Sequence, residues 1–165
     1  MARLLALDVG EARIGVAVSD ATGFLASPYI TLYVSRNESQ TWAAIQRVID
    51  ETEAEALVIG LPTSLDGQLH AQGQRVLSFA ERLQPHIEIP LTFWDERFST
   101  VEAERLLVQR NQDEWGGRQK RQRRTDRRPT VTKRRQKGQQ IDAYAAAVIL
   151  QDYLDHLGSS KKETI

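Results

Sequence analysis

Carboxylates occur at three places where the sequence predicts the end or the beginning of a buried element. Asp8 closes an apolar run, Asp95 and Glu96 follow another, and Asp142 begins an apolar helix face. A carboxylate beside an apolar element is costly unless it is hydrogen-bonded or bound to a cation. Mg²⁺ and Mn²⁺ prefer oxygen ligands of this kind. Two such ions about 4 Å apart can hold a phosphodiester, activate a water and stabilise the leaving oxygen. If the carboxylates cluster and bind such ions, the chemistry they predict is phosphodiester hydrolysis.

Each carboxylate also has a purely structural explanation. Asp8 can take part in the turn through Gly10, because Asp is frequent in turns. Asp95 and Glu96 can face solvent in a loop, and Asp142 can stabilise the start of a helix through the helix dipole. The metal-site hypothesis therefore requires that the fold bring the carboxylates together.

The position of Asp142 on its helix favours a site. At about 100° per residue, Ala146 and Ile149 share the face of Asp142, while Gln151 and Asp155 point roughly the other way. This arrangement predicts that Asp142 lies on the buried stripe of the helix, within its first turn.

A net charge of zero conceals a strong asymmetry along the chain. Residues 110–137 hold 12 Lys and Arg against 3 Asp and Glu, a net charge of +9, and the remaining residues carry −9. Such a basic segment attracts a phosphate backbone through counterion release, although it can also be a solvated loop. Residues 111–138 contain almost no apolar side chains, so we expect this segment to be a mobile insertion that binds nucleic acid.

Hydrophobic periodicity predicts the elements that must position these groups. Strands at 3–9 and 14–18 form a hairpin, and a third strand follows Pro28. The later elements are helix, strand, helix and strand up to residue 94, then a capped helix from Ser99 and a last helix from about Gln139 to Leu157. Three antiparallel strands followed by β-α-β-α units predict an α/β fold, a mixed five-stranded sheet with helices on both faces.

Length and composition limit the class of protein. The 165 residues fit one domain, 1–165, and 41% hydrophobic with 27% charged residues is typical of globular proteins. With 0 Cys there is no disulfide framework, thiolate metal site or cysteine nucleophile, which fits a reducing compartment. No apolar run approaches the roughly 20 residues that span a bilayer, and the start lacks the features of a signal peptide. We therefore expect a cytoplasmic protein that does not bind membranes.

Several short motifs, in this order and spacing, resemble one family. They are LDVG at 7–10, RIGVA at 13–17, SD at 19–20, VIGLP at 58–62, DG at 66–67, DER at 95–97 and IDA at 141–143. Together, over nearly the whole chain, they resemble the YqgF (RuvX) family of pre-16S rRNA nucleases, also described as Holliday junction resolvase-like. The resemblance implies a ribonuclease H-like fold, a cytoplasmic location and a role in maturing the 5′ end of 16S rRNA.

The resemblance also implies roles for individual residues. Carried over by motif, Asp8, Glu96 and Asp142 are the catalytic and metal-binding carboxylates, with Arg13 and Arg97 near the substrate. The basic segment adds candidate phosphate contacts, which are Arg123, Arg124, Arg127, Arg128 and Lys137. The family joins its last two helices by a short basic link, whereas residues 111–138 look extended here. The expected partners are pre-rRNA, ribosomal particles and branched DNA.

Three other functions stay open at this point. A Holliday junction resolvase-like enzyme would cut branched DNA with the same carboxylates. An RNA-binding assembly or transcription factor with inactive carboxylates would bind without turnover. The segment from Asp8 to Gly15 also matches the phosphate loop of actin-like ATPases and sugar kinases, although those proteins need two lobes and this chain has the length of one.

Overall fold

The computed structural model describes residues 2–62, 70–95 and 132–162, with the backbone alone at 132–140 and 160–162. No helix in these ranges is both long and apolar enough to cross a membrane. The helix expected from Ser99 lies outside the described residues, as does the basic segment up to residue 131. The elements in chain order are β1 (Leu4–Val9), β2 (Arg13–Ser19), β3 (Ala26–Tyr33), α1 (Glu38–Thr52), β4 (Ala56–Leu61), α2 (Ala71–Leu83), a short 3-10 helix (Gln84–His86), β5 (Leu91–Asp95) and α4 (Thr132–Lys162).

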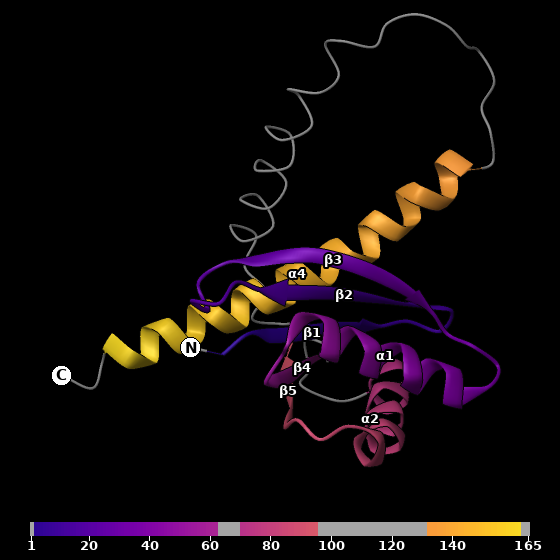
Figure 1. The fold of residues 1–165 in the computed structure, drawn as a ribbon, viewed down its shortest axis with the longest axis horizontal. Coiled ribbons are helices and arrows are strands. Elements are labelled where there is room, and N and C mark those ends of the chain that lie inside the picture. The colour runs from indigo at the N-terminus through magenta and orange to yellow at the C-terminus, as the bar shows by residue number, and fades with distance from the viewer. Residues whose placement is uncertain (1, 63–69, 96–131, 163–165) are drawn as a thin grey trace, which may run out of the picture.

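The five strands form one mixed sheet in the order β3-β2-β1-β4-β5 (Figure 1). β1 pairs antiparallel with β2, and β2 pairs antiparallel with β3. β4 joins β1 in parallel, and β5 joins β4 in parallel. Parallel neighbours need a crossover, which α1 and α2 provide, whereas short turns suffice for the antiparallel strands. The structure confirms the predicted α/β architecture.

Helices cover both faces of the sheet, with α1 and α2 on one face and α4 on the other (Figure 1). We call these the α1/α2 face and the α4 face. The strand positions in the α1/α2 core are Leu5, Leu7, Ile14, Val16, Leu57 and Ile59. Those in the α4 core are Ala6, Ala17, Ala26 and Val58. Because successive strand residues point to opposite faces, strands buried on both sides have the nearly continuous apolar runs seen in the sequence.

Local signals determine the bounds of α1. The side chain of Asn37 caps the helix by accepting a hydrogen bond from the backbone N–H of Ser39, 3.1 Å away. The helix ends at Glu53, whose backbone is left-handed with φ 55° and donates to the last carbonyls. The predicted apolar stripe is buried against the sheet, namely Trp42, Ile45, Val48 and Ile49.

The strand β3 starts earlier than the sequence predicts, at Ala26 rather than after Pro28. Proline cannot donate to a ladder hydrogen bond, which is why a strand boundary was expected there. β3 lies at the edge of the sheet, and its register with β2 shifts between Val16 and Ala17, beside the position of Pro28. An edge position with an irregular register is where a strand tolerates proline.

The helix α4 is longer at both ends than predicted. It begins at Thr132 rather than near Gln139 and continues to Lys162 beyond Leu157. The prediction treated the charged residues before Gln139 as part of a mobile insertion, but Lys, Arg and Gln have high helix propensity. Residues 132–138 of the proposed insertion are therefore helical, and residues 111–131 lie outside the described part of the chain.

Candidate active site

Asp8 lies one residue before the end of β1, on the α4 face of the sheet. In the β1–β2 ladder Asp8 stands opposite Gly15, so the two residues share one face. The neighbours of Asp8 in sequence, Leu7 and Val9, pack on the α1/α2 face instead. Position 15 carries no side chain, which leaves space beside the Asp8 carboxylate for another element.

Helix α4 occupies that space with its backbone. A Cβ added to Gly15 would lie 1.9 Å from the carbonyl oxygen of Asp142 and 3.0 Å from the backbone nitrogen of Ala143. Distances this short mean that only glycine allows the helix to approach the sheet so closely. Farther along α4, Ala146 and Ala147 are both buried against the sheet. Small residues in both layers therefore bring Asp142 next to the end of β1.

Arg13 completes a group of three charged side chains with Asp8 and Asp142. Its Nε lies 3.0 Å from Oδ2 of Asp142, and the Arg13 side chain is 42% exposed. Arg13 precedes Gly15 by two residues on β2, so it belongs to the same face as Asp8. The guanidinium offsets part of the negative charge that the two carboxylates bring together.

One carboxylate oxygen of this group lacks a hydrogen bond. Oδ2 of Asp142 is buried and has no hydrogen-bond partner among the described residues. The Nε of Arg13 is close to this oxygen, but the pair does not have the alignment of a hydrogen bond. The two groups therefore form an electrostatic contact that leaves a lone pair of the Asp142 oxygen available. A buried oxygen in this state is a natural ligand for a cation.

The charge state of Asp8 reflects the same surroundings. Burial raises the pKa of Asp8, and the negative charge of Asp142 raises it further. Both causes disfavour the carboxylate form, and a bound cation would oppose both. Two carboxylates with an unbonded buried oxygen fit a divalent ion that takes oxygen ligands. Among the described residues, no group of three or more His, Asp or Glu side chains gathers at one point.

The third predicted carboxylate, Glu96, lies outside the described residues, as do Arg97, Arg123, Arg124, Arg127 and Arg128. Lys137 is on α4, where only the backbone is described. Asp95 stands opposite Leu61 at the end of β5. Leu61 packs on the α1/α2 face, so the register places Asp95 on the face away from Asp8. Of the ten predicted site residues, the structure brings together Asp8, Arg13 and Asp142.

Two features of this site were missed at the level of sequence. Gly15 was part of a motif, but its role as the contact point for α4 was not predicted. A glycine inside a strand is a signal for close approach of another backbone, so the pattern contained the information. The contact between Arg13 and Asp142 had no comparable signal, because the two residues are far apart in the chain.

Comparison with known protein families gives one match over most of the chain. Residues 2–131 match the family model RuvX, described as Holliday junction resolvase. A relative from Thermoanaerobacter pseudethanolicus is 36% identical over 153 residues, covering 93% of this chain and 96% of its own. A relative from Roseiflexus sp. strain RS-1 is 39% identical and covers 93% of this chain and 94% of its own. Both relatives carry the name "Putative pre-16S rRNA nuclease".

Comparison of the fold points the same way. The structure of T. thermophilus RuvC in complex with a Holliday junction substrate superposes with a TM-score of 0.50 at 14% sequence identity, covering 94% of this chain and 96% of RuvC. At this identity the similarity concerns the fold, which is that of a ribonuclease H-like α/β domain.

Proposed function

Because this chain belongs to the RuvX family, we propose that it is a nuclease that hydrolyses phosphodiester bonds in the maturation of the 5′ end of 16S rRNA. The names of its relatives supply the substrate class, and their alignment covers almost the full length of both chains. We propose that the enzyme is an endonuclease and that it acts in the cytoplasm on precursor ribosomal particles. The observation that carries the proposal is the close approach of Asp8 and Asp142 beside Gly15.

The proposed cofactor is Mg²⁺ or Mn²⁺, held by Asp8, Asp142 and Glu96. The buried, unbonded Oδ2 of Asp142 and the raised pKa of Asp8 support a cation between these two residues. Glu96 is preferred over Asp95 because the strand register places Asp95 on the face away from Asp8. When bound, a divalent cation supplies Lewis-acid stabilisation of the charge that develops on the phosphodiester.

The basic residues would contact the substrate backbone. Arg13 is half-exposed, and its ion pair with Asp142 engages Nε. A guanidinium has five N–H donors, so Arg13 can orient Asp142 and also donate to a phosphate. The remaining candidates lie in or near the basic segment and are Arg97, Arg123, Arg124, Arg127, Arg128 and Lys137. We propose that residues 111–138 form a phosphate-binding arm of this single domain, which offsets the repulsion between the acidic site and a polyanion.

Substitution of the two carboxylates tests the mechanism. Asp8→Asn and Asp142→Asn keep the side-chain shape and remove the charge, so we expect cleavage of a 5′-extended 16S rRNA precursor to fall by about 10³-fold or more. Asp155→Asn, an exposed change on the same helix, is the matched control and should retain activity. Chelation should abolish wild-type cleavage, and Mg²⁺ or Mn²⁺ should restore it. Unchanged turnover in both site variants would overturn the nuclease mechanism and leave a binding factor.

A second candidate function is cleavage of four-way DNA junctions. The family description favours it, since that description names a Holliday junction resolvase. The same carboxylates would act on either substrate, so the two functions differ only in what the surrounding surface binds. Parallel assays with the RNA precursor and a synthetic four-way junction separate them, because the physiological substrate should have the higher kcat/KM.

A further inference from the structure

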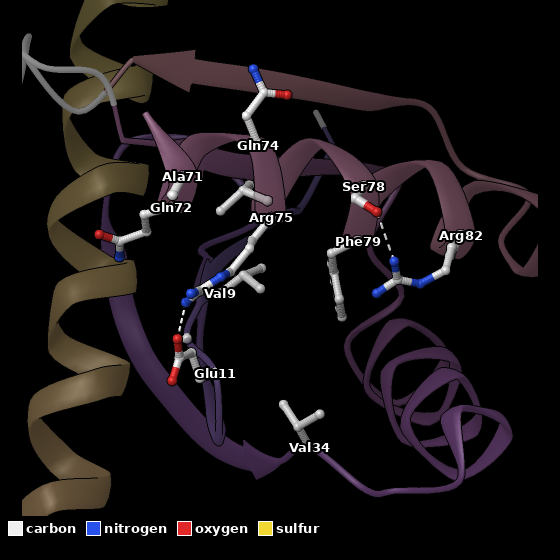
Figure 2. A pocket seen from close by; sticks show the side chains of 12 residues that line it. Val9, Glu11, Val34, Ala71, Gln72, Gln74, Arg75, Ser78, Phe79 and Arg82 are labelled. Carbon is white, nitrogen blue, oxygen red and sulfur yellow. Dashed lines mark hydrogen bonds and ion pairs between the residues drawn. The ribbon is translucent and has the colours of Figure 1, made fainter. Parts of the chain in front are cut away.

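A large cavity lies on the α1/α2 face, next to the end of β1 but on the opposite side from Asp8. It has a volume of about 870 Å³, within the roughly 300–1,000 Å³ of small-molecule sites. Its inner wall is apolar and includes Val9, Val34, Val76 and Phe79. Figure 2 shows α2 along one side of this space, with Val34 across from it and Phe79 pointing inward.

Polar groups surround the apolar wall, and two of them are cationic. Arg75 and Arg82 lie seven residues apart on α2, and both line the cavity. Arg75 is paired with Glu11 of the β1–β2 turn, as the dashed line in Figure 2 shows. Because both side chains of that pair are well exposed, an anion can compete with Glu11 for the guanidinium.

Arg82 retains donors for a ligand. Its Nε lies 2.9 Å from Glu38, and its Nη1 donates to the Ser78 hydroxyl at 2.7 Å. Two of the five N–H donors of the guanidinium are engaged by these described partners, and the others can bind a phosphate. The cavity thus combines an apolar wall, which suits a planar base, with guanidinium groups at its edge.

The end of β1 connects this cavity to the proposed active site. Asp8 points to the α4 face, while Val9 and Gly10, the next two residues, line the cavity. At Gly10 the carbonyl oxygen of Arg13 lies 2.8 Å from where a Cβ would stand, and the backbone N–H of Gly10 donates to that oxygen at 2.9 Å, so the strand ends in a tight turn between the two sites. From this arrangement we propose that the cavity is a nucleotide-binding subsite, in which the base contacts Val76 and Phe79 and a phosphate contacts Arg82. Binding of a nucleotide does not depend on the proposed nuclease function. Only the suggestion that the nucleotide belongs to an RNA substrate rests on that function.

Binding can be measured in the full-length Asp8→Asn protein with chelator present, so that cleavage does not interfere. The probes are AMP, UMP, inorganic phosphate and a short single-stranded oligoribonucleotide, with NMR signals of Val9, Val76 and Phe79 as the readout. Ser78→Trp should fill the cavity and Arg82→Gln should remove a phosphate contact, each weakening nucleotide binding about tenfold. The matched controls are Glu81→Trp, exposed on α2 outside the cavity, and Arg47→Gln, which removes one exposed positive charge on α1.

The outcomes separate the possible sources of the nucleotide. Shifts with AMP or UMP that both cavity variants weaken support a site for a free nucleotide. Shifts with the oligoribonucleotide alone, weakened in the same way, support a subsite for the substrate chain, and a higher KM for RNA cleavage in Arg82→Gln would agree. The proposal would be overturned if neither the mononucleotides nor the oligoribonucleotide shifted these signals, or if inorganic phosphate alone did. It would also be overturned if the cavity variants and the control variants changed binding equally. If the wild-type protein cleaves no RNA, the nuclease function fails while the binding result stands.

Discussion

The two faces of the sheet are packed by side chains of very different size. On the α1/α2 face, the strands contribute leucine, isoleucine and valine to a core that includes Trp42 and Phe79. On the α4 face, the buried strand positions are mostly alanine, and the helix meets them with Ala143, Ala146 and Ala147 before contributing the larger Ile149, Leu150 and Leu154. Both faces are buried, and on the α4 face the small residues allow the backbone of α4 to come close to Gly15.

This difference separates stability from positioning. Each fully buried Leu or Ile of the α1/α2 face contributes about 1.5–3 kcal/mol by removing apolar surface from water. An alanine contributes much less, but it allows two backbones to come close. The small residues of the α4 face contribute less hydrophobic stabilisation, but they allow α4 to lie against Gly15. Only in that position does Asp142 reach the side of Asp8.

The most damaging change to this arrangement is Gly15→Ala. Its new Cβ would collide with the carbonyl of Asp142, so α4 must move away from the sheet. Overpacking of this kind costs about 1–3 kcal/mol or more, and a shift of about 1 Å at a site can lower turnover 10²-fold. We expect the free energy of unfolding, measured in urea, to fall by about 3 kcal/mol and nuclease activity to fall by at least about 100-fold.

The control for this variant is Gly158→Ala near the end of α4. A Cβ at that position meets nothing within 4 Å, so stability should be unchanged or rise by up to about 1 kcal/mol through helix propensity. If Gly15→Ala retained full activity, the close approach of α4 would not be what aligns the two carboxylates.

The opposite behaviour is expected on the other face, in Leu7→Ala. Leu7 is 1% exposed, and loss of a buried leucine costs about 2–5 kcal/mol. Leu7 packs away from the carboxylates, so the folded fraction should keep its kcat within about threefold. Urea unfolding gives the loss of stability, and activity measured at low temperature gives the kcat of the folded fraction. A loss of activity well beyond the loss of folded protein would contradict the separation of the two faces.

A smaller effect concerns the polar connection between α4 and the start of β3. The Gln151 Oε1 accepts from the backbone N–H of Ala26 at 3.0 Å, and its Nε2 donates to the carbonyl of Phe24 at 3.0 Å. Gln151→Met keeps the volume and removes both hydrogen bonds, so we expect a loss of about 1–2 kcal/mol in thermal or urea unfolding. Gln46→Met on α1 is the control, because it removes only a solvent-exposed hydrogen bond to Asp50. Equal stability in both variants would mean that the α4 face is held by apolar packing alone.

These residues also mark how far the sequence could predict the structure. The order and type of the strands followed from apolar runs and their spacing, because burial on both faces leaves a strong pattern. The placement of Asp142 on the inner face of α4 followed from the same periodicity. In contrast, Gln151 was expected to point away and instead contacts β3, because helix periodicity describes one stripe and α4 packs over a wider surface. The early start of β3 depends on an edge position and a register shift, which belong to the tertiary fold.

The last comparison between the faces is electrostatic and concerns Asp152, an acidic residue buried on the α4 side. It is 8% exposed and accepts a hydrogen bond from Nε1 of Trp94 at 2.8 Å. Burial raises the pKa of Asp152 above the ordinary 3.8, an effect that the hydrogen bond from Trp94 partly opposes. In the folded state the carboxyl group therefore holds its proton to higher pH than it does in the unfolded chain.

The sign of the pH dependence follows from this difference. Between pH 3.8 and the raised pKa, the folded protein binds more protons than the unfolded chain, so the contribution of Asp152 to stability falls as the pH rises. Asp152→Asn does not titrate and can still accept from Trp94. We expect this variant to gain stability relative to the wild type between about pH 4 and pH 7, with a difference that becomes constant above the raised pKa. Urea unfolding at several pH values measures it, with the exposed Asp50→Asn as the control for a change in net charge. A difference that is flat with pH, or that falls as the pH rises, would show that burial does not disfavour the charged form of Asp152.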